Sequence, residues 1–485
     1  MKPRLLLHAL RAARPRQLRA RALRPLARRR FPTGSPPSFE PPLGPVDLWR
    51  SPAFEADRLA GTGVERLRGF HAQYGEDVLA LARQGEAAGA RAAMLAWIER
   101  HPARPSDAWH PYPLSTRAGN WLAALALEPD AATREIVESL WRQLLHLEWN
   151  VEDDILGNHV IRNARALLLG AAAFGSAELL ESGSGLLARE LPEQVLADGG
   201  HYERSPVYHL IVLRDLLEVE AALPGSVPAN VIERMLRFAS GLARPDGHPA
   251  LFNDGTLDLA PQLALPPPRD GLSLFSETGY AVVRREGIWL AFDCGPPAPA
   301  HLPAHAHADA LSFQLWLDGE PVVVDPGMPT YETGPERDWF RGTRAHSTVS
   351  LDGRDQFELW GAFRSGPLPR VDLLEATEQH LEAAVSWPGG IRHVRVLTID
   401  ADVLLVDDRI EGAGRHTVMS SLQLAPAAAA EIAAEGLPVG RETRRVSERL
   451  FSPTEAPALV MRGELDLPGR LGWRLARSGG ATIAP

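Results

Sequence analysis

Histidines and carboxylates are concentrated in one stretch of the chain that is otherwise rich in β-prone apolar residues. His305 and His307 are followed by Asp309, then by Asp325 at the end of an apolar run and by His346 just before another. Residues two apart on an extended segment point the same way, so the first two imidazoles face one region. This pattern indicates a metal site or a proton-transfer site, and therefore an enzyme.

The same stretch offers ligands for one divalent metal. His307, Asp325 and His346 form a nitrogen and oxygen set that suits zinc. The chain has one cysteine, Cys294, so the ligands of any such site must be nitrogen and oxygen atoms. This cysteine also has no partner for an internal disulfide, and we expect it to be a small buried residue.

Two further polar clusters lie in the first half of the chain. Asn158 and His159 open a long apolar helix, where the asparagine could instead act as a helix cap. Tyr208 follows Ser205-Pro206, a pattern typical of a cap and the first helical position, and a tyrosine there could simply be a packing residue. Four arginines are candidates for gripping carboxylates, although each alone could be an ordinary surface or structural charge: Arg162, Arg204, Arg341 and Arg344.

Together these residue types match the needs of β-elimination from a uronic acid glycan. The C5 proton lies next to a carboxylate and becomes acidic once that charge is neutralised by an amide, a histidine or an arginine. A tyrosine or histidine must then take the proton, and an acid must protonate the O4 leaving group.

Composition limits the alternatives. The chain has 485 residues, of which 45% are hydrophobic, so it can bury a large core and form two or three domains. Its net charge is −10, and residues 1–30 contribute eleven positive charges and no negative one, so the remainder carries −21. An acidic body argues against general nucleic-acid binding.

The arginine-rich start of the chain predicts a basic amphipathic or disordered arm. The apolar run Leu5-Leu6-Leu7 is too short for an ordinary secretory signal. The alternative interpretation is a degenerate export signal or a membrane-surface signal. No segment approaches the roughly 20 apolar residues of a membrane span. The sequence itself therefore favours a cytoplasmic or membrane-associated protein.

Apolar spacing changes character along the chain. A Pro-rich linker ends the arm at about residue 46, and helical spacing continues to about 245 in runs separated by short Gly, Pro and Asp breaks. The predicted helices are Ala87–Ile98, Trp121–Leu127, Ala131–Leu147, His159–Phe174, Ala177–Leu191, Val207–Leu223 and Val231–Leu242. Antiparallel helical hairpins of this kind form a bundle or a toroid.

A Pro-rich segment near 265 precedes short runs typical of strands, with a turn signal at Asp318-Gly319. The predicted strands are Tyr280–Arg284, Ile288–Asp293, Leu311–Leu317, Val322–Asp325, Thr348–Leu351, Leu381–Trp387, Ile391–Ile399 and Val403–Arg409. We therefore predict an α+β multidomain protein with an arm and linker at 1–46, a helical domain at 47–262 and an antiparallel β-sandwich at 263–485.

At this point the sequence resembles the heparinase II/III-like family of polysaccharide lyases and its alginate and oligoalginate lyase relatives. The resemblance covers most of residues 105–365, and its segments occur in the family's order. The matching segments are WHPYPLSTRAGNW, GNHVIRNARAL, DGGHYERSPVYHLIVLRDLL, PDGHPALFNDG, HAHADALSFQLWLDGEPVVVDPG and RGTRAHSTVSLDGRDQFELWGAF.

The resemblance implies an incomplete (α/α) toroid followed by a β-sandwich, with the cleft between them. It implies that Asn158 neutralises the substrate carboxylate, that His159 abstracts the proton and that Tyr208 is base, acid or both. His305 corresponds to a catalytic or orienting histidine, and Tyr331 lies near a second active-site tyrosine of some relatives. It further implies a structural zinc on His307, Asp325 and His346, an acidic polysaccharide substrate and a periplasmic location, although export signals typical of such relatives are replaced here by the arm.

Three hypotheses remain open. The first is a lyase that leaves a 4,5-unsaturated sugar, with Arg162, Arg204, Tyr331 and Arg341 as substrate-binding residues. The second is a non-catalytic protein that binds glycan or assists exopolysaccharide assembly. The third is a metal-dependent glycan hydrolase. The sequence leaves the oligomeric state undetermined.

Overall fold

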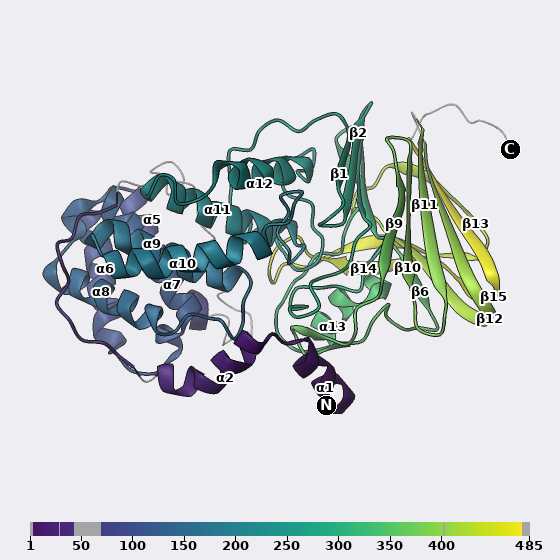
Figure 1. Cartoon of the computed structure of the whole chain (residues 1–485). Helices are drawn as coiled ribbons and strands as arrows, with labels where there is room; N and C mark the ends of the chain where they lie inside the picture. Colours follow the sequence, from purple (N-terminus) through teal and green to yellow (C-terminus); the bar gives the residue numbers. More distant parts are fainter. Residues whose placement is uncertain (1–2, 29, 43–68, 401–402, 478–485) are drawn as a thin grey trace.

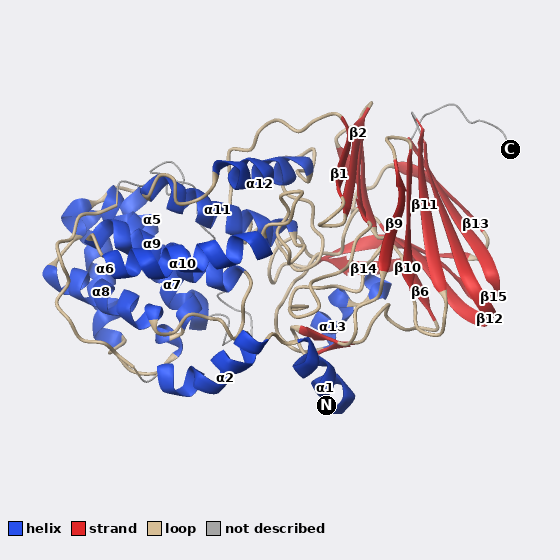
Figure 2. Ribbon diagram, in the orientation of Figure 1, coloured by secondary structure: helices blue, strands red, loops and turns tan. Residues whose placement is uncertain are grey.

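The computed structural model describes residues 3–28, 30–42, 69–400 and 403–477, and within them most helices lie at one end of the molecule and the large sheets at the other (Figures 1 and 2). Helices come first in the chain and antiparallel strands follow. Part of the predicted linker (43–46) and the start of the predicted helical domain (47–68) lie outside the described residues. No helix in the described part of the chain is long and apolar enough to cross a membrane.

Ten longer helices precede the first strand in the described part of the chain. Their bounds are α1 Pro3–Ala12, α2 Pro15–Ala27, α5 Glu76–Arg83, α6 Ala87–Arg100, α7 Pro111–Leu127, α8 Arg134–Glu148, α9 Asn158–Phe174, α10 Ala177–Gln194, α11 Pro206–Ala222 and, last, α12 Ala229–Gly241, with α1 and α2 forming the arm. Short 3-10 turns lie at Asp107–Trp109 and Pro129–Ala131. The arm is therefore helical, as the amphipathic interpretation predicted.

Local sequence sets most of these helix boundaries. Ser205 caps α11 by accepting a hydrogen bond from the backbone N–H of Tyr208, and Pro206 is the first helical residue, as predicted. Asn158 is not a cap, because Gly157 occupies that position and Asn158 begins the helix itself. The predicted helix Trp121–Leu127 is only the second half of α7, because the prolines at its start are placed where the first helical turn tolerates them.

The β half contains two large antiparallel sheets and a small hairpin. The five-stranded sheet has the order β1-β2-β3-β4-β5, and the eight-stranded sheet has the order β13-β15-β12-β11-β10-β9 with β14 and β6 joined at its side. The bounds are β1 Gly271–Phe275, β2 Tyr280–Arg285, β3 Ile288–Asp293, β4 Phe313–Leu317, β5 Glu320–Val323, β6 Val349–Leu351, β7 Leu359–Trp360, β8 Arg364–Ser365, β9 Val371–Ala376, β10 His380–Ser386, β11 Arg392–Asp400, β12 Val403–Gln423, β13 Ala430–Glu435, β14 Val439–Val446 and β15 Thr454–Arg477.

Strand positions agree well with the alternation of apolar residues, but strand lengths do not. Leu317 pairs with Glu320 across Asp318-Gly319, and both turn residues have positive φ, which confirms the predicted hairpin. β12 runs on to Gln423, far beyond the predicted Arg409, because it pairs with β15 along most of its length. One helix also interrupts the strands, α13 at Pro335–Arg341.

One apolar core joins the two sheets. It contains Val283 and Leu290 of the five-stranded sheet and Leu381, Leu397 and Leu475 of the other, all fully or almost fully buried. Cys294 belongs to this core as well and is a buried free thiol, as expected. A separate core fills the helical half.

The two halves are held together by polar contacts at their junction. Asp198, in the loop after α10, accepts hydrogen bonds from both the backbone N–H and the hydroxyl of Thr278. Arg284 on β2 donates to the backbone carbonyls of Ser240 and Gly241 at the end of α12. These contacts fix the loops of one half against those of the other.

Gly279 and Gly295 approach each other too closely to admit a side chain. A Cβ at Gly279, whose φ is +99°, would lie 2.3 Å from the Cα of Gly295. We predict that Gly279→Ala lowers the free energy of unfolding by about 3 kcal/mol or more, because conformational strain adds to a backbone clash. Urea denaturation measures this.

Gly389→Ala is the matched control. Gly389 has a similar φ of +85°, but a Cβ there meets nothing within 4 Å. It should lose only about 1 kcal/mol, from the unfavourable backbone conformation alone. Equal losses in the two variants would contradict the close-approach explanation.

Candidate active site

The candidate residues converge where helix starts of the first half meet loops of the second. Tyr112 lies in the first turn of α7, His159 in the first turn of α9 and Tyr208 in the first turn of α11. His305 and Tyr331 come from loops around the five-stranded sheet. Side chains far apart in sequence therefore line one region.

Tyr208 contacts both loop residues. Its ring stacks on that of His305, with centroids 3.9 Å apart and an interplanar angle of 27°. Its hydroxyl shares a hydrogen bond of 2.8 Å with the hydroxyl of Tyr331. Burial, and then the neighbouring Tyr331, raise the pKa of Tyr208 well above its ordinary value. Tyr208 is therefore a neutral proton donor at neutral pH.

His305 is held from both sides by carboxylates. Its Nδ1 lies 3.0 Å from Asp254 Oδ2 and its Nε2 lies 3.1 Å from Glu203 Oε2. Burial lowers the pKa of His305, but the hydrogen bonds to Asp254 and Glu203 outweigh burial and raise it to about 9. Arg337 donates to both oxygens of Asp254, with Nη2 2.6 Å from Oδ2.

His159 is positioned by a second carboxylate. Its Nδ1 lies 3.1 Å from Glu152 Oε1, and Asn163 donates to the other oxygen of Glu152 at 3.2 Å. With Nδ1 donating to Glu152, Nε2 is left as the acceptor. The side chain is 26% exposed, so it is accessible from solvent.

Tyr112 connects His159 to the Tyr208 pair. Its ring centroid lies 4.3 Å from that of His159. It is also close enough to Tyr208 and Tyr331 to raise the pKa of each. Asn158 lies beside His159 in sequence, and its backbone N–H donates to Glu203 Oε1 at 2.8 Å. The four predicted catalytic residues thus lie around one region.

The predicted substrate-binding arginines divide into two groups. Arg162 lines a cavity, where its Nε lies 2.8 Å from Asp215 Oδ2. Arg204 donates instead to the backbone carbonyls of Tyr202, Glu277 and Thr278, and Arg341 to those of Ala306, Gly361 and Ala362.

Arg204 and Arg341 therefore fix loops around the site through these backbone contacts. Arg344 lies away from the cluster, with its guanidinium 5.8 Å from the centroid of the Trp339 ring.

The cavity next to Tyr112 has a volume of about 360 Å³ and is lined by both halves of the protein. Arg162 and Arg214 contribute positive charge from the helices, and Arg449 contributes it from the segment between β14 and β15. Glu76, at the start of α5, lies on the same wall. Each of these arginines is paired with a carboxylate: Arg162 with Asp215, Arg214 with Glu218 and Arg449 with Asp258. The cavity therefore suits a polar ligand that can share these guanidinium groups.

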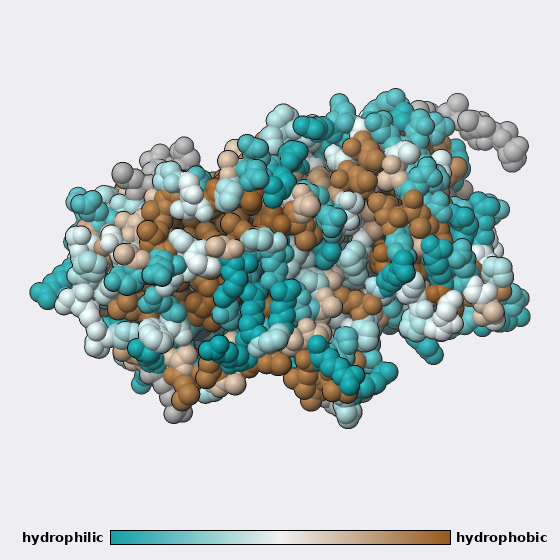
Figure 3. Space-filling view, in the orientation of Figure 1, coloured by the Kyte–Doolittle hydropathy of each residue, from teal (hydrophilic) through white to brown (hydrophobic). Residues whose placement is uncertain are grey.

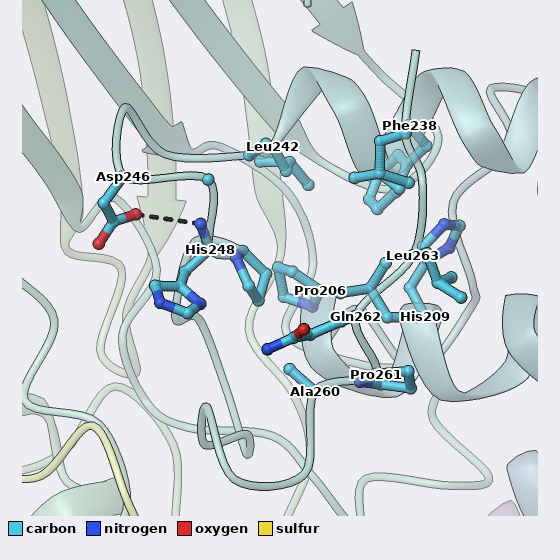
Figure 4. A pocket seen from close by; sticks show the side chains of 16 residues that line it. Pro206, His209, Phe238, Leu242, Asp246, His248, Ala260, Pro261, Gln262 and Leu263 are labelled. Atoms are coloured by element: carbon cyan, nitrogen blue, oxygen red, sulfur yellow. Dashed lines mark hydrogen bonds between the residues drawn. The ribbon is translucent and has the colours of Figure 1, made fainter. Parts of the chain in front are cut away.

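A smaller cavity of about 180 Å³ lies on the other side of the loop around residue 261 (Figure 4). Its walls are mainly apolar, and the carboxylate of Asp246 accepts the backbone N–H of His248 at 3.1 Å. His209 faces this cavity and its Nε2 lies 3.0 Å from the carbonyl of Met235, so it stabilises packing.

The predicted metal ligands lie together behind His305. His346 Nδ1 is 2.9 Å from Asp325 Oδ2, and the rings of His307 and His346 lie 5.4 Å apart. One ligand atom from each of His307, Asp309 and His346 lies within 4.8 Å of the others. Among the described residues this group contains Asp309, which was not predicted, and does not contain the predicted Asp325, which instead contacts His346. All four side chains are buried.

Several residues at the site escaped the sequence analysis: Tyr112, Glu152, Glu203, Asp254, Arg337 and Phe363. Phe363 stacks on Tyr331, with ring centroids 5.8 Å apart. Tyr112 and Asp254 stand within two of the segments that carried the resemblance, but their roles depend on contacts across 47 to 83 positions. Leu156, Arg204 and Asn253 lie beside the site and all have positive φ. Such backbone strain can mark a functional site, but it is visible only in the three-dimensional structure.

A helical half, an antiparallel β half and a Tyr/His cluster at their junction define a polysaccharide lyase class of architecture. The family described as Heparinase II/III N-terminus matches residues 92–277, and Heparinase II/III-like, C-terminal matches residues 267–483. The chain belongs to this heparinase II/III-like polysaccharide lyase family.

Known relatives share this fold over most of the chain. A heparin-sulfate lyase of Pedobacter heparinus is 23% identical over 318 residues, which cover 53% of this chain and 47% of the relative. FtsZ-localized protein C of Caulobacter vibrioides is 28% identical over 400 residues, covering 76% and 66% respectively. A crystal structure of heparinase III superimposes with a TM-score of 0.67 at 18% identity, covering 86% of this chain and 77% of that one. This chain thus spans about half the length of the lyase.

The buried carboxyl group of Glu76, which lines the cavity, makes the stability of the folded protein depend on pH. Burial outweighs the nearby arginines and raises its pKa from 4.5 to about 7. The folded state therefore holds this proton more tightly than the unfolded chain, so ionisation of Glu76 lowers stability as pH rises from about 4.5 to about 7 and adds no further change above it.

We predict that Glu76→Gln removes this loss. The difference in unfolding free energy between variant and wild type should grow across that pH window by at most about 3 kcal/mol. Urea denaturation at several pH values measures it. Parallel curves for the two proteins would show that the carboxyl is not held in its neutral form.

Proposed function

We propose that this protein is a polysaccharide lyase that cleaves the 1,4-glycosidic bond of a uronic acid-containing glycan by β-elimination. The observation that carries this proposal is the contact of Tyr208 with His305 and Tyr331, with His159 reached through Tyr112, beside an arginine-lined cavity. These are the groups that elimination requires, and Tyr112 joins their cluster to the wall of the cavity.

In the proposed reaction the C5 proton moves to a base and its electron pair forms the C4=C5 double bond. The C4–O4 bond breaks, and O4 takes a proton as the preceding sugar leaves. No water is consumed, and the product is a 4,5-unsaturated uronic acid. The substrate carboxylate must be neutralised for the first step, which we assign to the amide of Asn158.

The geometry supports His159 as the base and Tyr208 as the acid. His159 is oriented by Glu152 so that Nε2 can accept a proton. Tyr208 remains protonated and bonds to a second hydroxyl, that of Tyr331, through which its proton can be replaced. His305 carries positive charge against the Tyr208 ring, which favours the developing negative charge of substrate or tyrosine.

We infer that the helical hairpins form an incomplete (α/α) toroid and that the two sheets form a sandwich around their shared core. The name of the Pedobacter relative supports an acidic polysaccharide such as a heparan-type glycan as substrate. We assign Arg162 to substrate binding, because it lines the cavity.

A non-catalytic role is the second candidate. The match to FtsZ-localized protein C covers more of this chain than the match to the Pedobacter lyase, 76% against 53%. A member of this fold can therefore carry a name that refers to localisation instead of catalysis. Such a protein would use the cleft to bind glycan without breaking it.

Incubation with heparan-type, alginate-type and glucuronan-type polymers tests the proposal, because the new double bond absorbs ultraviolet light. We predict that Tyr208→Phe lowers kcat by a factor of about 100 or more, since it removes the proton donor while keeping the ring. Tyr280→Phe is the control, because the Tyr280 hydroxyl donates to the backbone carbonyl of Arg204 at the junction, and its loss should leave kcat within severalfold.

Wild-type protein that binds a uronic polymer without raising the absorbance would favour the non-catalytic role. Products without a double bond, together with activity lost to a chelator, would favour a metal-dependent hydrolase.

We further propose one structural divalent metal, zinc, held by His307, Asp309, Asp325 and His346. His307 donates from Nε2 to Asp254 and leaves a buried Nδ1 without a hydrogen-bond partner among the described residues. His346 Nε2 lies 3.0 Å from the carbonyl of Phe340, which leaves Nδ1 on the side of Asp325. Metal-bound histidines are oriented in this way, each with its other nitrogen bound to a carboxylate or carbonyl.

The carboxylates also fit a cation. Asp309 is fully buried, and neither of its oxygens has a hydrogen-bond partner among the described residues. Buried carboxylates without compensation are strongly unfavourable. When bound, the metal would neutralise them and anchor the loop that carries His305.

Metal analysis of the purified protein should find about one zinc per chain. We predict that His346→Ala and Asp309→Asn lower this content, and that a chelator lowers the Tm of the wild type. His380→Ala is the control, because His380 lies in the separate, more exposed group Glu375, His380 and Glu382. Wild-type protein that binds no zinc after reconstitution would contradict the site.

A further inference from the structure

The arm helices α1 and α2 present apolar side chains to the outside of the molecule. Among the residues that the structure describes, thirteen large apolar side chains are exposed, and six of them lie between residues 3 and 28. They are Leu6 at 37%, Leu7 at 48%, Leu10 at 46%, Leu18 at 40%, Leu23 at 49% and Leu26 at 72% exposure. Chance exposure does not explain why six of these thirteen side chains lie in one short segment.

The orientation of α2 is the reverse of an ordinary surface helix. Gln17, Arg21 and Arg24 recur at intervals of four and three residues and face the protein, while Leu18 and Leu26 face outward. A surface helix of a globular protein normally buries its apolar stripe. Here the polar stripe binds the body, so the apolar stripe is left for another partner.

Specific ion pairs hold α2 in this orientation. Arg16 Nη1 lies 2.8 Å from Glu190 Oε1, and Arg14 Nη1 lies 2.6 Å from Glu193 Oε2. Arg24 pairs with Asp154. Glu190 and Asp154 are buried, so these are built contacts and not transient surface pairs.

α1 is attached in a similar way on the β side of the molecule. Leu5 is buried at 5% exposure near Gly366, and Arg4 Nη2 lies 2.9 Å from Glu358 Oε2. Leu6, Leu7 and Leu10 then share the outer face, being three and four residues apart. α1 and α2 lie along the same lower edge of the molecule, where Figure 3 shows patches of apolar residues.

A tryptophan extends this surface. Trp149 is 50% exposed, and the neighbouring Asn150 donates to the carbonyl of Ala27 at the end of α2. The guanidinium of Arg30 lies 3.2 Å from the centroid of the Trp149 ring. Tryptophan and arginine beside exposed leucines are the composition of a membrane–water interface.

Charge identifies the partner's chemistry. Residues 1–30 hold eleven basic residues and no acid, while the rest of the chain is strongly acidic. Arg11 and Arg19 are exposed and form no ion pair with another described residue. An acidic protein surface approaches an anionic bilayer only through such a basic face, since each Lys or Arg contributes about 1 kcal/mol near anionic lipid.

We propose that the outer face of α1 and α2, defined by Leu6, Leu7, Leu10, Leu18, Leu23 and Leu26 with Trp149, docks this protein on the surface of an anionic phospholipid bilayer. The leucines enter the boundary between headgroups and acyl chains, and the exposed arginines contact lipid phosphates. The attachment is peripheral and does not depend on the proposed catalytic activity.

Co-sedimentation of the full chain with vesicles tests this proposal. We expect binding to vesicles of phosphatidylcholine with about one third phosphatidylglycerol, much weaker binding to phosphatidylcholine alone, and weakening by salt. The arm variant Leu18→Gln/Leu23→Gln/Leu26→Gln should raise the apparent Kd at least about tenfold, since three leucines lose their apolar contact.

The control variant is Leu180→Gln/Leu274→Gln/Leu405→Gln. It removes three leucines of 41%, 41% and 44% exposure away from the arm. Its binding should stay within about twofold of wild type. Circular dichroism and lyase assays on both variants distinguish loss of docking from loss of folding or catalysis.

Light scattering measures the oligomeric state and so tests whether a second copy of the chain covers the arm leucines. A wild-type dimer that becomes a monomer in the arm variant, without lipid, would show that a second copy covers the leucines and would overturn the proposal. Equal vesicle binding by wild type and arm variant, or no binding by wild type, would overturn it too.

Discussion

The buried carboxylate of Asp254 is the interaction on which the site depends. One oxygen accepts a hydrogen bond from His305 and the other from His307, and Arg337 donates to both. Asp254 therefore couples His305, which stacks on Tyr208, to the proposed metal site through one rigid group. A carboxylate buried to this degree is tolerated only because three donors surround it. Removal of any donor would leave the others to compensate a fully buried charge, so the arrangement holds as a unit.

Contacts at the junction between the two halves also fix the positions of the site residues. Glu203 bonds His305 on one side and the first turn of α9 on the other, so it links the loop of the β half directly to the helix that carries Asn158 and His159. Nearby backbone strain at Arg204 and Asn253 fits this picture, since Arg204 fixes the loop through carbonyls of Glu277 and Thr278. Strain of this kind persists only where surrounding contacts over-determine the backbone.

The arm contacts the same region from outside. Arg24 bonds Asp154 and His110, and two residues before Asp154 stands Glu152, which orients His159. One loop thus carries both the attachment of the arm and the support of the proposed base. A protein docked through the arm would present its cleft at a fixed height and direction relative to the surface that it binds, which matters for an enzyme acting on long polymers.

The sequence by itself determined the order of elements and most of their positions, because helix and strand periods are local properties of neighbouring residues. The helix from Ala177, the strand at Ile288–Asp293 and the turn at Asp318-Gly319 all follow from such patterns. The family also followed from short segments, and with it a set of candidate site residues. Only the tertiary structure decided which of these meet.

The same holds for individual side chains at the site. Arg204 and Arg341 look like carboxylate-binding residues in sequence, yet backbone carbonyls occupy their guanidinium groups. Asp254 and Arg337 gain their importance from a contact across 83 positions. The outward face of α2 likewise depends on acids more than a hundred residues away. Contacts of this range arise from the packing of whole domains, which no local pattern encodes.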